Sequence, residues 1–327
     1  MTTVTFAEAL NAALMDSLAE DHDVIVLGED VGKLGGVFRV TDGLAAKFGA
    51  DRCLDTPLAE SGIVGVALGM ALYGRRPVVE LQFDGFTYPA FEQIISHVAK
   101  YRNRSRGTVA LPLTLRVPYG GGIGGAEHHG ESPEAYFAHT AGLKVFTPAT
   151  PADAYALLRE AITLDDPVVF LEPKRRYWAK QELSLPATAA PAGTAVIRRP
   201  GRDLTLVTYG SMLPVCLEAA ELAAADGWDL EVLDLRTLVP LDEHGLLRSV
   251  ARTGACVTVS EAPPTAAFAT DIAAFVSEHA WDYLRAPVLR VGAFDVPYPP
   301  SRIEQRYLPD AARVLDAVAA TLKGRTT

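Results

Sequence analysis

Residues 143–171 read LKVFTPATPADAYALLREAITLDDPVVFL, and this stretch shows the alternation that decides the fold. An apolar strand pattern at 143–147 precedes a helical pattern at 151–163, and a second apolar run follows at 168–171. Thr150 is a favourable N-cap for the helix, and the proline after it suits a first helical turn. Strands that alternate with helices form parallel sheets, so the stretch predicts an α/β protein.

The same alternation extends in both directions, starting from a capping box at Thr5 that predicts the first helix. Before residue 143, strands are predicted at 24–27, 78–83 and 111–117, and helices at 63–73 and 91–103. After residue 203, strands are predicted at 204–208, 230–233, 255–259 and 288–291, and helices at 213–225, 242–252, 266–279 and 309–322. Periodicity fades at 182–200, which predicts a linker between domains at 1–190 and 191–327.

The bulk composition is that of a globular protein with two domains. The chain has 327 residues, of which 49% are hydrophobic and 21% charged. A net charge of −10 argues against nucleic acid or an anionic membrane as the main partner. The longest apolar run, at 63–73, is well short of the ~20 residues that span a bilayer. The start of the chain has no secretory signal pattern, and the three scattered cysteines suggest no disulfides, so we expect a cytoplasmic protein.

A glycine run at 120–125 formally contains the GxGxxG pattern of dinucleotide-binding turns. Such a turn opens directly into a helix and is followed about 20 residues later by an acid at a strand end. Here the run leads into Glu127, and the strand at 143–147 ends without an acid. We therefore expect no dinucleotide, and instead a backbone that passes close to a ligand or a neighbouring subunit.

Glu127, His128 and His129 follow this run and allow three interpretations. A metal site is disfavoured because adjacent histidines diverge and no further ligand cluster accompanies them. A histidine placed before a helix start can transfer protons near neutral pH. A hydrogen-bonded structural histidine is equally compatible with the residues. In the same way, Glu60 before the helix at 63–73 is explained by the helix dipole alone.

Several spaced motifs together resemble the β subunits of thiamin-diphosphate-dependent 2-oxo acid dehydrogenases. They lie at 28–31, 35–39, 55–60, 132–135, 142–145, 234–238 and 307–310, and so cover nearly the whole chain. The resemblance implies a transketolase-like fold with a pyrimidine-binding domain and a C-terminal domain, each with a mainly parallel sheet flanked by helices. It also implies an α2β2 heterotetramer in which α and β chains share each cofactor.

The resemblance assigns roles to individual residues. Glu60 matches the glutamate that bonds the aminopyrimidine ring nitrogen of thiamin diphosphate and promotes the imino form. His129 matches a histidine that assists proton transfers and the reductive acylation of the lipoyl group. The positions that match cofactor contacts are Glu29, Leu58, Gln82 and Phe86, although for Phe86 the residues alone fit core packing equally well.

The sequence lacks the Gly-Asp-Gly motif with which thiamin enzymes usually anchor the diphosphate and Mg²⁺. The resemblance therefore implies that the α subunit holds both. It also implies a monovalent cation, such as K⁺, near Leu113, Thr114, Ala161, Leu164 and Asp166. Leu164 replaces an acid that is usual at this cation site.

Residues 88–91 and 171–174 resemble branched-chain 2-oxo acid dehydrogenases more than pyruvate dehydrogenases. We therefore expect a branched-chain 2-oxo acid substrate and a lipoyl-bearing acyltransferase as acceptor. A pyruvate or acetoin dehydrogenase is the alternative within the family. A transketolase relative, a nicotinamide oxidoreductase and a scaffold subunit that only binds the acyltransferase core are the further alternatives.

Overall fold

The computed structural model describes residues 1–323 and groups them into two compact units. The N-terminal unit comprises residues 1–119 and 136–192, and the C-terminal unit comprises 120–135 together with the chain from 193 onward. The glycine run therefore packs with the C-terminal unit. Each unit has a mainly parallel sheet, as the sequence predicts.

The sheet of the N-terminal unit has the strand order β6-β7-β5-β4-β2-β3, and every neighbouring pair is parallel. These strands are β2 (Val24–Gly28), β3 (Cys53–Asp55), β4 (Arg76–Glu80), β5 (Thr114–Tyr119), β6 (Lys144–Phe146) and β7 (Val168–Pro173). β1 (Thr2–Thr5) and β8 (Lys180–Leu183) form a separate antiparallel pair. The carboxyl ends of parallel strands lie at one edge of a sheet, where α/β proteins bind ligands.

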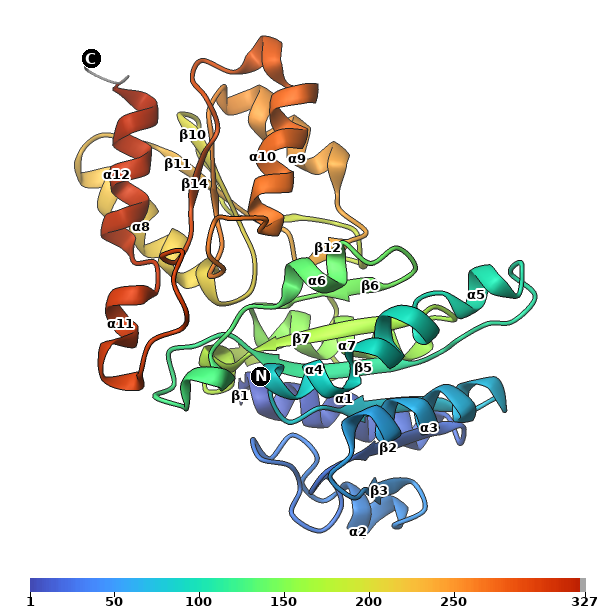
Figure 1. Cartoon of the computed structure of the whole chain (residues 1–327). Coiled ribbons are helices and arrows are strands. Elements are labelled where there is room, and N and C mark those ends of the chain that lie inside the picture. Colours follow the sequence, from blue (N-terminus) through green and yellow to red (C-terminus); the bar gives the residue numbers. More distant parts are fainter. Residues whose placement is uncertain (324–327) are drawn as a thin grey trace. The chain divides into compact units, whose positions relative to one another are not determined.

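Two long helices, α1 (Phe6–Glu20) and α7 (Pro151–Thr163), lie side by side and pack with one face of this sheet (Figure 1). Alternate strand residues such as Val26, Val78 and Phe170 share a buried cluster with them. The predicted capping box at Thr5 and the N-cap at Thr150 are both present. Every second strand residue faces the helices, and the N-caps fix where the helices begin. Together these features produce the predicted layers of helix and sheet.

The remaining helices of the N-terminal unit are α2 (Leu44–Phe48), α3 (Glu60–Leu72), α4 (Thr87–Glu92) and α5 (Tyr101–Arg104). Between α4 and α5 the chain winds as a π-helix at Gln93–Val98, so the predicted helix at 91–103 begins earlier and is not uniform. A short helix, α6 (Glu134–Ala138), follows the glycine run and the 3₁₀ turn at Glu127–His129. No helix among residues 1–323 combines the length and hydropathy needed to cross a membrane.

The sheet of the C-terminal unit has the order β14-β13-β10-β11-β9, in which only β9 is antiparallel. Its strands are β9 (Val196–Arg199), β10 (Leu204–Thr208), β11 (Leu230–Asp234), β13 (Cys256–Val259) and β14 (Leu289–Val291), and β12 (Thr237–Val239) is a further short strand. Its helices are α8 (Leu213–Ala225), α9 (Glu243–Thr253), α10 (Phe268–His279), α11 (Glu304–Tyr307) and α12 (Ala311–Leu322). In Figure 1, α8 and α12 lie together on one side of this sheet and α9 and α10 on the other. β9 lies within the predicted linker, because antiparallel pairing with β11 orders a segment that has no strand pattern.

Candidate functional site

Three neighbouring strands of the N-terminal unit lead to three of the predicted site residues. Glu29 directly follows β2, Glu60 lies after β3, and Gln82 follows β4. Because β3, β2 and β4 are adjacent and parallel, their carboxyl ends deliver these residues to one edge of the sheet.

Glu60 is the first residue of α3 and is buried, with only 6% of its surface exposed. The preceding residue, Ala59, has no side chain that caps the helix, so the Glu60 carboxylate is the acidic group of the first turn. A carboxylate here is favoured by the helix dipole, typically by about 0.3–1 kcal/mol. The dipole explains why an acid is tolerated at this position. It does not explain why Glu60 is buried, because an exposed carboxylate would interact with the dipole equally well.

Glu29 lies in an environment that disfavours its charge. Burial raises the pKa of its carboxyl, and the negative charges of Glu60 and Asp30 raise the pKa further. Oε1 of Glu29 is buried and makes no hydrogen bond. A buried carboxylate oxygen without a donor is unusual in a folded protein and is typical of a site that receives a ligand.

The loop that carries Glu29 is held from two sides. The Gln82 amide donates to the Glu29 carbonyl at 3.3 Å and to the Asp30 carboxylate at 3.1 Å. The Asp55 carboxylate accepts hydrogen bonds from the backbone N–H groups of Gly32 at 2.6 Å and Lys33 at 3.0 Å. Asp55 was not predicted as a site residue, and its signal was its place at the end of β3, five residues before Glu60.

The aromatic residue Phe86 contacts Phe83 edge to face, with ring centroids 6.1 Å apart. Phe83 contacts Phe38 in the same manner. Leu58 is 76% exposed. Cofactor contacts by Phe86 and Leu58 stay predictions.

Behind this edge a buried ion network joins three strands. The Arg116 guanidinium on β5 makes a bidentate pair with Glu172 on β7, at 2.7 and 2.9 Å, and a third hydrogen bond to Glu80 on β4 at 2.5 Å. The Tyr177 hydroxyl donates to Glu172 at 2.6 Å. The sequence signal for this network was that Glu80, Arg116 and Glu172 are charged residues within otherwise apolar strands. One cation and two acids leave excess negative charge, and burial raises the pKa of Glu80.

Residues 171–174, predicted to reflect substrate choice, are part of this interior. The ammonium group of Lys174 forms a buried ion pair with Asp84 at 2.5 Å. Tyr88, in the other substrate motif, contacts Tyr136 edge to face, as does Phe91. The 171–174 motif is therefore buried, and its link to substrate choice stays a prediction.

His129 belongs to the C-terminal unit, where Glu127–His129 forms a single 3₁₀ turn. His129 is half-buried whereas His128 is exposed, and their ring centroids are 4.0 Å apart. Among residues 1–323 no cluster of three or more histidine, cysteine or acidic side chains could hold a metal ion. The structure thus distinguishes the two histidines and gives no support to the metal interpretation.

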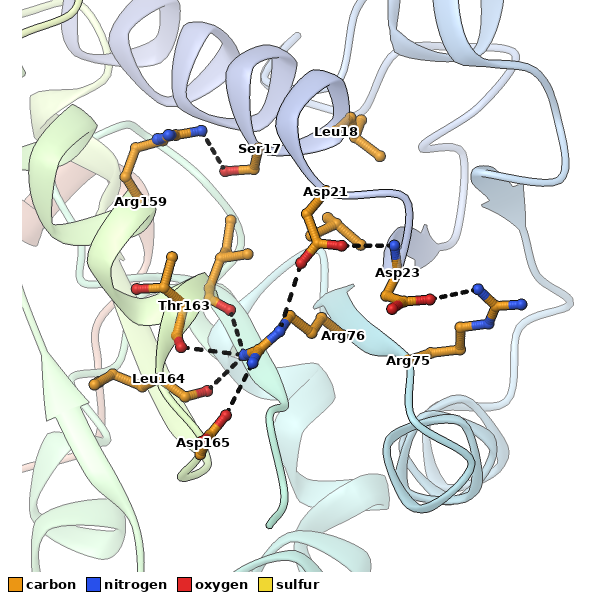
Figure 2. A network of polar contacts seen from close by, with 12 residues as sticks. Ser17, Leu18, Asp21, Asp23, Arg75, Arg76, Arg159, Thr163, Leu164 and Asp165 are labelled. Carbon is orange, nitrogen blue, oxygen red and sulfur yellow. Dashed lines mark hydrogen bonds and ion pairs between the residues drawn. The ribbon is translucent and has the colours of Figure 1, made fainter.

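The predicted monovalent-cation site lies where α7 ends, and cationic side chains already reach it. The Arg76 guanidinium donates to the backbone carbonyls of Ile162, Thr163 and Leu164 at 3.1–3.3 Å. Figure 2 shows its bonds to Thr163 and Leu164. Arg76 also pairs with Asp165 at 2.9 Å (Figure 2).

Two other residues of the predicted cation site also have partners. The Leu113 carbonyl accepts from Val168 at 2.9 Å. The Asp166 carboxylate pairs with Arg102 and, at 3.6 Å, with Lys144. Since these charges neutralise the turn, the structure adds no support for a cation, which stays a prediction.

Residues 2–179 match the model of the transketolase pyrimidine-binding domain, and residues 193–314 match that of the transketolase C-terminal domain. A pyruvate dehydrogenase E1 component subunit beta from Leifsonia xyli is 52% identical over 98% of this chain and 95% of its own length. The chain belongs to the E1 β-subunit family of 2-oxo acid dehydrogenases.

Other E1 β relatives carry a different substrate in their names. A 3-methyl-2-oxobutanoate dehydrogenase subunit beta from Mycobacterium tuberculosis is also 52% identical, over 98% of this chain and 92% of its own length. Among solved structures, a split-gene transketolase described as an inactive beta4 tetramer aligns with a TM-score of 0.81 at 26% identity, over 98% of both chains. The predicted transketolase-like fold and E1 β membership are confirmed, and identity alone does not separate the two substrates.

Proposed function

We propose that this E1 β chain is one half of an α2β2 component that oxidatively decarboxylates branched-chain 2-oxo acids and transfers the acyl group to a lipoyl group of an acyltransferase. The observation that carries the proposal is the sheltered pair of acids, Glu60 and Glu29, at the carboxyl edge of the sheet. The unpartnered oxygen of Glu29 fits a site completed by a cofactor and a second subunit. The free, buried cysteines suit a cytoplasmic location.

The cofactor of the proposal is thiamin diphosphate, which when bound would supply a nucleophilic carbon and an electron sink for decarboxylation. The Glu60 carboxyl would share a proton with the pyrimidine ring nitrogen. Glu29 and Gln82 would lie at the polar side of the ring, and Leu58 and Phe86 would provide apolar contact with it. His129 exchanges protons with the acyl acceptor.

The α subunit of the proposal holds the diphosphate and Mg²⁺, since the sequence has no Gly-Asp-Gly motif. The exposed face of α3 is the docking surface of the proposal. Val66 and Tyr73 are 55% and 87% exposed there, and Gly62 and Gly69 lie on the same helical face. Glu60 lies on the opposite, buried side of the same helix. An exposed apolar helix face is normally covered by a partner.

The experiment that tests the proposal is reconstitution with an α subunit co-purified from native extract. We expect kcat/KM for 3-methyl-2-oxobutanoate to exceed kcat/KM for pyruvate by roughly tenfold, since one pocket contact is worth about 1–3 kcal/mol. Pyruvate as the better substrate would instead favour the second candidate, a pyruvate dehydrogenase, which relatives at the same identity also represent.

A further inference from the structure

The glycine-rich segment before His129 has an unusual backbone. Gly120, Gly122 and Gly124 have φ values of 77°, 83° and 72°, which side chains rarely permit. Alternation of left-handed and ordinary residues turns successive N–H groups toward one side and forms a concave site for an anion.

The anions at this concave site are two carboxylates of the same unit. Glu304 at the start of α11 accepts from the N–H of Gly122 at 3.2 Å and of Gly124 at 2.8 Å. Glu261 accepts from the N–H of Gly121. The N–H groups that a nucleotide phosphate would need thus donate to these carboxylates.

Both carboxylates are buried, with 5% of Glu304 and 4% of Glu261 exposed. A buried carboxylate is costly unless it is hydrogen-bonded, and bonds from N–H groups to a charged acceptor are among the stronger ones. The Tyr298 hydroxyl donates a further bond to Glu304 at 2.8 Å, and Ser211 donates to Glu261. The glycine segment and the two acids therefore stabilise each other.

The Tyr298 ring fixes both ends of the segment. A Cβ on Gly121 would lie 1.8 Å from the Tyr298 hydroxyl, and a Cβ on Gly130 would lie 2.5 Å from its ring. The N–H of Gly120 also donates to the Glu131 carbonyl at 2.8 Å and closes the loop. The turn that carries His129 lies between these two fixed ends.

We propose that Glu304 is a positioning residue for His129, with Glu261 and Tyr298 as its supports. Its carboxylate accepts hydrogen bonds from the N–H groups of Gly122 and Gly124. These bonds fix the backbone conformation of the segment, and so set the position and orientation of the His129 side chain. The catalytic part of this inference rests on the proposed function of His129.

The first test uses Glu304→Ala and Glu304→Gln in the reconstituted complex, with Glu231→Gln as control. Glu231 is a buried acid of the same unit that bonds Thr205 and does not touch the segment. We expect Glu304→Ala to slow acylation of a lipoylated domain by roughly 10- to 100-fold, with KM for the 2-oxo acid within about twofold. Glu304→Gln, which keeps one acceptor oxygen, should be intermediate, and the control should match the wild-type rate.

A double variant shows whether Glu304 acts through His129. If it does, His129→Ala with Glu304→Ala should be no slower than His129→Ala alone, within about threefold. Losses that multiply would overturn the proposal, and so would an unchanged rate in Glu304→Ala.

A second readout does not need catalysis. Diethylpyrocarbonate modifies accessible imidazoles, and mass spectrometry follows His128 and His129 separately. In the wild type we expect His128 to react several times faster than His129, since only His128 is exposed. Glu304→Ala should narrow this ratio and Glu231→Gln should not. An unchanged ratio would overturn the proposal even in a complex that proves inactive, whereas inactivity of the wild type alone would count only against the proposed function.

Discussion

At the scale of single residues, Glu60 is buried and lies near a second acid, Glu29. Replacement of Glu60 should therefore affect catalysis and stability differently. We expect Glu60→Gln to lower decarboxylation in the reconstituted complex by roughly 10²- to 10⁴-fold, because a positioned proton donor is lost. The midpoint of thermal unfolding should not fall, since the charge that raises the pKa of Glu29 is removed. Steady-state rates and calorimetry check both. Full activity would favour the scaffold interpretation.

The carboxyl of Glu134 gives a prediction for pH. Burial raises its pKa to about 7, and its Oε2 atom makes no hydrogen bond. The folded state then holds the proton more tightly than the unfolded state, so the free energy of unfolding falls as pH rises from about 4.5 to 7, by at most about 3 kcal/mol. Glu134→Gln should weaken this pH dependence and be the more stable protein at pH 8. Denaturation at pH 5 and pH 8 measures it, with the exposed acid change Glu218→Gln as control.

The ion network around Arg116 gives a stability prediction with a built-in comparison. Arg116→Met leaves Glu80 and Glu172 buried without their cation, so the free energy of unfolding should fall by about 3–5 kcal/mol. Arg75→Met removes a pair with Asp23 whose side chains are 44% and 52% exposed, and it should change stability by less than about 1 kcal/mol. Equal losses in urea denaturation would contradict this ranking.

At the scale of elements, the exposed face of α3 predicts how the chain assembles. A Cβ on Gly69 would meet nothing within 4 Å, so Gly69→Leu is accommodated by the chain itself and removes a flexible helical glycine. If the α subunit packs closely on this face, the same change blocks assembly. We expect unchanged or higher stability together with at least tenfold weaker association in sedimentation experiments. Glu218→Leu on α8 is the control, and intact assembly of Gly69→Leu would place the partner elsewhere.

Elements with strong local signals were predicted well, and elements defined by distant pairing were not. The helices Pro151–Thr163 and Leu213–Ala225 and the strand Leu204–Thr208 have the predicted bounds, because caps and apolar periodicity act locally. β9 was missed because its order comes from β11. For the same reason, nothing in the sequence showed that the glycine run at 120–125 belongs with the C-terminal unit.

The candidate site was predictable only in part. The alternation of strands and helices places Glu29 and Gln82 at strand ends, but only the family resemblance identified Glu60 and His129 as a set. Asp55 and Glu304 were missed because their partners are backbone N–H groups, which leave no residue pattern in the sequence.

At the scale of the whole molecule, the chain has sheltered acids at the carboxyl edge of its N-terminal sheet but no Gly-Asp-Gly motif for a diphosphate. We expect the isolated chain to bind thiamin diphosphate with a dissociation constant above about 100 μM, because most of the charge of the cofactor lies on its diphosphate. Addition of the α subunit should tighten binding at least 100-fold. Isothermal titration calorimetry measures both, with thiamin as the control ligand, and micromolar affinity of the lone chain would contradict the shared site.

The bare face of α3 also has a consequence for the cell that makes this protein. Copies produced in excess of their partner keep Val66 and Tyr73 exposed to water, and exposed apolar helix faces promote aggregation. Matched synthesis of the two polypeptides then matters as much as the affinity between them, and an unpaired surplus becomes a burden for chaperones and proteases.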